Sequence, residues 1–82
     1  MEFNKERLAR AMKVGRAKKG WTQWELAARS GVNRGVICDY EREATDNPLF
    51  PSLVAIADAL GCSLDDFADV SGQEEKGVLT NG

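Results

Sequence analysis

The three residues from Gly31 to Asn33 constrain this fold more than any other part of the sequence, because they alone separate two short helical segments. The first segment covers residues 23–30, and the second covers residues 33–42, with Asn33 both ending the turn and capping this second helix. Gly31 tolerates the positive φ that so tight a corner requires. Asn33 can accept a hydrogen bond from a free backbone amide and so begin the second helix. The sequence therefore predicts two short helices that meet at a sharp turn.

Side chains around this turn indicate how the two helices pack. A small residue is needed where they cross, and Ala27 supplies it. Val32, Ile37 and Tyr40 are apolar and can hold the second helix against a core. The opposite face of that helix carries the residues expected to project into solvent: Arg34, Gly35, Cys38, Asp39 and Arg42. Two helices joined by a short turn that contains glycine are typical of a helix-turn-helix, and a projecting helix face with a cation near its N-terminus fits the DNA major groove.

Small polar residues and glycines mark the ends of three further helices. The expected caps are Asn4, Ser52 and Ser63, and the expected stops are Gly20 and Gly61. No segment reads as a convincing strand. We therefore expect an all-α fold, a compact domain of five helices over residues 1–69. Residues 70–82 are mostly polar or glycine and are expected to form a flexible C-terminal tail.

Two local patterns carry further expectations. Thr22 and Glu25 form the sequence T-x-x-E, in which each side chain can satisfy a free backbone amide at the start of a helix. Gly15 lies inside the first predicted helix, where glycine costs about 1 kcal/mol relative to alanine. Close packing against a neighbouring helix would explain a glycine there.

The composition argues against catalysis, metal binding and membrane insertion. The chain has no histidine, and Cys38 and Cys62 are too few and too far apart for a zinc site, so we expect no metal and no cofactor. No nucleophile with a paired base is visible, so we do not expect an enzyme. No apolar run approaches the ~18–20 residues of a membrane span, and the start lacks the layout of a signal peptide. We expect a complete cytoplasmic protein.

Charge is distributed unevenly along the chain. Residues 1–42 hold ten of the eleven lysines and arginines and five acids, for a net charge of +5. Residues 43–82 hold one lysine and eight acids, for a net charge of −7. This asymmetry suggests one surface suited to a polyanion, although a solvated surface with accidental asymmetry accounts for it as well.

Several motifs in order resemble the Cro/CI (XRE-type, lambda-repressor-like) helix-turn-helix family. They are Gly20-Trp21-Thr22-Gln23, Leu26-Ala27, Gly31-Val32, Ile37, Tyr40-Glu41-Arg42, Pro51-Ser52 and Ala57-x-x-Leu60-Gly61. The resemblance covers roughly residues 4–68. It implies a DNA-binding domain whose second helix-turn-helix helix enters the major groove.

The resemblance also implies roles for individual residues. The positions expected to face the bases are Arg34, Gly35, Cys38 and Asp39. Those expected to contact phosphate are Gln23, Asn33 and Arg42. Arg34 can bond to guanine O6 and N7, and Asp39 can accept from cytosine N4. Arg16 and Glu41 match a structural ion pair that links the first helix to the end of the third.

Two single positions and one loop depart from the family pattern. Gly35 stands where relatives often carry a base-reading side chain, and glycine reads no base. The loop from Glu43 to Pro51 is longer than usual and contains Glu43 and Asp46 but no cation, so it would repel phosphate unless it folds away. Trp24 lies on a normally exposed side of its helix. It is either an incidental surface aromatic or a contact for a protein partner.

The sequence thus favours a sequence-specific DNA-binding transcriptional regulator, a repressor acting on double-stranded DNA as a homodimer. Relatives often dimerise through the last helix and its flanks, here near residues 64–70. The alternative is a protein-interaction module, such as an antitoxin or adaptor, that keeps the fold with weak or no DNA binding.

Overall fold

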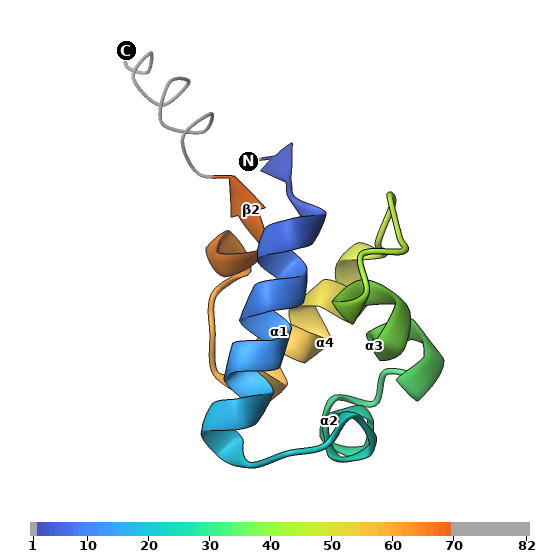
Figure 1. The fold of residues 1–82 in the computed structure, drawn as a ribbon, viewed down its shortest axis with the longest axis vertical. Helices are drawn as coiled ribbons and strands as arrows, with labels where there is room; N and C mark the ends of the chain where they lie inside the picture. The colour runs from blue at the N-terminus through green and yellow to red at the C-terminus, as the bar shows by residue number, and fades with distance from the viewer. Residues whose placement is uncertain (1, 70–82) are drawn as a thin grey trace.

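The computed structural model describes residues 2–69, which form a bundle of helices closed by one short pair of strands (Figure 1). The elements are, in chain order, β1 (Glu2–Phe3), α1 (Lys5–Lys19), α2 (Gln23–Ser30), α3 (Arg34–Glu41), α4 (Phe50–Leu60), the 3₁₀ helix η1 (Leu64–Phe67) and β2 (Ala68–Asp69). Helix α1 runs along the centre of the view, with α2 and α3 on one side and η1 on the other. The all-α class predicted from the sequence is confirmed, while the predicted tail, residues 70–82, lies outside the described residues.

Most of the predicted helix ends are present. The Asn4 side chain accepts hydrogen bonds from the amides of Glu6 and Arg7, and α1 ends at Gly20 with φ 69°. The Thr22 hydroxyl accepts from the Glu25 amide, which is one half of the expected capping box. The full reciprocal box occurs at η1, between Ser63 and Asp66. These ends depend on residues two to four positions apart, which is why the sequence alone predicts them.

Three details differ from the expectation. Helix α4 begins at Phe50 rather than after Ser52, and its N-cap, Leu49, makes no side-chain bond. Pro51 accounts for this start, because proline has its φ already set for a first helical turn and no amide to leave unpaired there. The fifth helix is a single 3₁₀ turn of four residues. Strands β1 and β2 were not predicted, since two residues each are too short to show an alternating pattern.

The core takes one or two large side chains from each helix. Six side chains of this kind are fully buried: Leu8, Met12, Leu26, Ile37, Ile56 and Phe67. Gly15 lies against Leu60 of α4, and a Cβ at position 15 would lie 3.1 Å from Leu60 Cδ1. The close packing expected at Gly15 is therefore present, and it brings α1 and α4 together.

The antiparallel pair β1–β2 joins the two ends of the described chain. Glu2 pairs with Asp69 and Phe3 with Ala68, while the Asn4 amide donates to the Phe67 carbonyl at 3.3 Å. The segment 64–69 is thus tied to the start of α1 and belongs to the folded unit. Over residues 2–69, no helix is long and apolar enough to cross a membrane.

Candidate nucleic-acid interface

Helices α2 and α3 form the predicted turn, with Gly31 at φ 78° closing α2. Asn33 caps α3 by accepting a hydrogen bond from the Gly35 amide at 2.7 Å. Val32, Ile37 and Tyr40 are buried, as their pattern predicts. The residues expected to face DNA lie on the other side of α3, where Gly35 and Arg42 are exposed and Arg34, Cys38 and Asp39 are half-buried. The geometry brings the predicted site residues of α3 together on one surface.

A buried ion pair connects α1 to the end of α3. Arg16 donates to Glu41 twice, from Nε to Oε2 and from Nη2 to Oε1, at 2.7 Å each. Only 5% of Glu41 is exposed. The hydrogen bond to Glu41 raises the pKa of the Arg16 guanidinium above its usual value, while partial burial acts in the opposite direction. Arg16 also donates to the Trp21 carbonyl at 3.0 Å, so this one side chain fixes α3 and the entry to α2.

Gln23 extends this network to the start of α3. Its Nε2 donates to Glu41 Oε1 at 3.1 Å, and its Oε1 accepts from Arg34 Nη1 at 3.4 Å. The chain of side chains from Arg16 through Glu41 and Gln23 therefore reaches Arg34. The family resemblance implied the pair Arg16–Glu41, but not the two bonds of Gln23, which join residues 18 and 11 positions apart.

The exposed tryptophan of α2 lies beside the same arginine. The guanidinium carbon of Arg34 is 4.3 Å from the centroid of the Trp24 ring. Trp24 is 68% exposed, as its position on the helix predicted. The sequence did not predict that its ring contacts the first residue of α3.

Gly35, the first departure from the family pattern, has a local explanation. A Cβ at this position would lie 3.0 Å from Asn33 Oδ1, the atom that caps α3. Glycine at position 35 therefore makes room for the cap and leaves the α3 backbone uncovered beside Arg34.

Asp39 and Arg42 are paired on the exposed side of α3. Arg42 donates to Asp39 Oδ1 from Nη2 at 2.9 Å and from Nε at 3.2 Å. The family resemblance implies that Asp39 faces the bases and that Arg42 contacts phosphate, and it does not predict this pairing. Because one carboxylate oxygen already accepts from Arg42, the two side chains form one unit in the free protein.

The acidic loop after α3 is tied back to α1. Lys5 Nζ lies 2.8 Å from Asp46 Oδ1, an exposed pair. Their mutual hydrogen bond raises the pKa of Lys5 and lowers that of Asp46. Tyr40 Oη accepts from the Leu49 amide at 3.3 Å and holds the far end of the loop. The loop charge at Asp46 is thus partly neutralised by α1.

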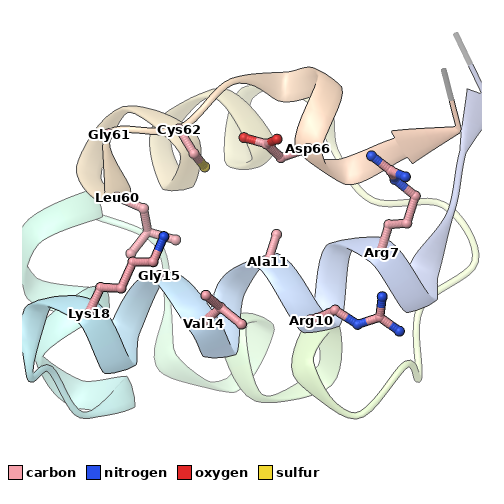
Figure 2. A pocket seen from close by; sticks show the side chains of 10 residues that line it. All are labelled: Arg7, Arg10, Ala11, Val14, Gly15, Lys18, Leu60, Gly61, Cys62 and Asp66. Atoms are coloured by element: carbon pink, nitrogen blue, oxygen red, sulfur yellow. The ribbon is translucent and has the colours of Figure 1, made fainter.

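A groove of about 480 Å³ lies along another side of α1, between α1 and the segment from Leu60 to Asp66 (Figure 2). Arg7 and Arg10 stand at one end and Lys18 at the other. The Cys62 thiol lies in this groove. Burial is the main cause that raises its pKa, and the negative charge of Asp66 raises it further. No residue of α2 or α3 lines it. Some of the basic charge of residues 1–42 therefore lies away from the α3 surface.

The described residues show no grouping of the kind that holds a metal: no three of their cysteine, aspartate and glutamate side chains come together. Both cysteines, Cys38 and Cys62, are free thiols.

The fold and the α2–turn–α3 unit define a helix-turn-helix domain. A family model described as helix-turn-helix matches residues 12–67, more than half of the chain. The chain belongs to the XRE-type helix-turn-helix family, and the resemblance drawn from its motifs is confirmed.

Two curated relatives and one solved structure are similar to the chain. Antitoxin HipB of Escherichia coli K12 is 34% identical over 62 residues, which is 76% of this chain and 69% of HipB. Antitoxin HipB of E. coli O6:H1 (strain CFT073) shows the same identity over the same length, covering 65% of that protein. The crystal structure of the hypothetical transcription factor NHTF from Neisseria superposes with a TM-score of 0.66 at 26% identity, covering 98% of this chain and 92% of NHTF.

Proposed function

We propose that this protein is a sequence-specific DNA-binding regulator that places α3 in the major groove of double-stranded DNA in the cytoplasm. The observation that carries the proposal is the position of Arg34, the first residue of α3, with its guanidinium bonded to Gln23 and the exposed face of α3 beside it. Membership of the helix-turn-helix family and the similarity to a transcription factor support it. Repression by occupying a promoter is the simplest mode of action.

Each polar residue of the surface has a role suited to its chemistry. Arg34 is proposed to read guanine, since a guanidinium can donate to O6 and N7 together. Asp39 is proposed to read cytosine while it shares its carboxylate with Arg42, which contacts phosphate. Gln23 and Asn33 are proposed to contact phosphate at the ends of α2 and α3. Gly35 and Cys38 are small and allow the α3 backbone to approach the bases.

Replacing Arg34 with alanine is expected to weaken binding to the preferred duplex by about 1–3 kcal/mol and to relax specificity at one base pair. Titrations by fluorescence anisotropy on the preferred duplex and on a duplex changed at that pair would measure both effects. Lys18→Ala is the matched control, because it removes one cation from the groove beside α1. Equal losses on specific and random DNA would contradict a base-reading role for Arg34.

We further propose that two copies of the protein bind an inverted repeat. One domain offers few base contacts, and symmetric half-sites about one helical turn apart require two copies. The surface best suited to self-association is the start of α4, where Leu49 and Phe50 are 67% and 64% exposed and Val54 is 41% exposed. Phe50 also borders an apolar hollow shared with Leu64, in the region near residues 64–70 where the family resemblance implies dimerisation. The end of that region, Val70, lies outside the described residues.

Phe50→Glu is expected to convert the dimer to a monomer without unfolding it, since the side chain is exposed. Sedimentation velocity over a concentration series would report the change. Val14→Glu, at an exposed apolar position of α1, should leave the dimer intact. A wild-type protein that remains a monomer on DNA, or a Phe50→Glu dimer, would contradict this interface.

A second candidate function is favoured by the similarity to antitoxin HipB. In that case the domain binds a protein partner, through the exposed Trp24 or the acidic loop, and binds DNA weakly or not at all. Its signature would be low affinity for every duplex, with little dependence on salt.

A further inference from the structure

Trp24 has no evident part in the stability of the fold. Its ring is 68% exposed and lies outside the cluster of side chains that form the core. Trp21, three residues earlier, behaves differently: it is partly buried and packs against that core. A large exposed aromatic side chain next to a proposed base-reading residue therefore calls for another explanation.

The contacts of Arg34 supply that explanation. Its guanidinium carbon lies 4.3 Å from the Trp24 ring centroid, and its Nη1 donates to Gln23 at 3.4 Å. Trp24 and Gln23 are neighbours in the first turn of α2, so α2 holds the guanidinium at two points. Gln23 is itself bonded to the buried carboxylate of Glu41.

A guanidinium held in this way is suited to reading a base. A guanidinium that lies over a ring face is attracted to the ring and can still donate hydrogen bonds from its N–H groups. One of these donors bonds to Gln23, and the others are available for a paired acceptor such as guanine O6 and N7. Holding the long side chain before DNA arrives also reduces the conformational freedom that binding must remove.

We propose that Trp24 is a positioning residue that determines specificity: by its ring contact with Arg34 it fixes the direction in which this guanidinium meets a guanine. The proposal rests on the proposed DNA-binding function. It assigns the exposed tryptophan to DNA reading through Arg34, rather than to a protein partner.

The test compares Trp24→Ala with Trp24→Phe in the full chain. Trp24→Ala is expected to weaken binding to the preferred duplex about three- to tenfold, and to weaken binding much less when the guanine read by Arg34 is replaced. Trp24→Phe keeps a ring face and should retain most of the affinity and the specificity. Thermal unfolding of both variants should match the wild type, since the side chain is exposed.

A double-mutant cycle separates positioning from other roles. In an Arg34→Ala background, Trp24→Ala should have no further effect on DNA binding, because the group that it positions is gone. Equal losses from Trp24→Ala with and without Arg34 would overturn the inference.

Two more outcomes distinguish this inference from the proposed function. If Arg34→Ala reduces specificity and Trp24→Ala does not, the inference fails and the DNA-binding function stands. If neither variant changes binding to any duplex, and Trp24→Ala instead disrupts self-association, Trp24 is a protein contact and the reading role of Arg34 fails with it.

Discussion

Replacing Glu41 with alanine is expected to lower the free energy of unfolding by about 3–5 kcal/mol, because it leaves the side chain of Arg16, which is only 20% exposed, without its carboxylate. The same change removes the acceptor that holds Gln23. A domain of this size has a total stability of only about 4–12 kcal/mol, so much of the protein would unfold near physiological temperature. Urea denaturation followed by circular dichroism would measure the loss.

Two further variants, compared with Glu41→Ala, test whether an unpaired buried charge causes the loss of stability. Asp46→Ala removes one partner of the exposed pair with Lys5 and should leave the free energy of unfolding nearly unchanged, because solvent screens exposed charges. The double variant Arg16→Met/Glu41→Leu should recover part of the stability lost in Glu41→Ala, because it leaves no unpaired buried charge. A loss below 1 kcal/mol in Glu41→Ala would show that the pair does not hold α1 to α3.

Phe67→Ala is expected to cost about 3–5 kcal/mol. The ring is 2% exposed and lies at the end of η1, directly before the strand that pairs with β1. Removing the ring leaves a cavity beside α1 and weakens the pairing of β1 with β2, which joins the two ends of residues 2–69. Denaturant unfolding would give the change in free energy, and amide hydrogen exchange at residues 64–69 would locate it.

Leu49→Ala is the matched control for Phe67→Ala. Leu49 is 67% exposed, so its truncation should change the stability by no more than about 0.5 kcal/mol. If Phe67→Ala cost equally little, the segment 64–69 would lie outside the cooperative unit, and the domain would end near α4.

The fold was predictable where it depends on neighbours in the chain. The caps Asn4 and Asn33 and the αL stop at Gly31 follow from short patterns and appear in the structure. The predicted start of α4 after Ser52 is wrong: a serine before an apolar run resembles a cap, but Pro51 lies within the first turn of the helix. The pair β1–β2 joins segments more than sixty residues apart, and no local pattern indicates it.

The sequence predicted in which helices the candidate site residues lie, but of the contacts among them only the Arg16–Glu41 pair. The resemblance placed Gln23, Arg34 and Glu41 in the right elements, and it implied the pair Arg16–Glu41. The hydrogen bonds through Gln23 and the contact between Trp24 and Arg34 depend on how α2 crosses α3. How two helices cross depends on tertiary packing, so it cannot be predicted from the sequence pattern of each helix taken separately.

The most direct test of the central proposal is a fluorescence anisotropy titration of the full chain. The two duplexes are one enriched by the protein from a randomised pool and a scrambled version of it, each at low and near-physiological salt. We expect the enriched duplex to contain an inverted repeat and to bind at least about a thousandfold more tightly than the scramble, with an affinity that falls steeply as salt rises. No enrichment, with both duplexes bound weakly and alike, would contradict the proposal that α3 reads DNA sequence.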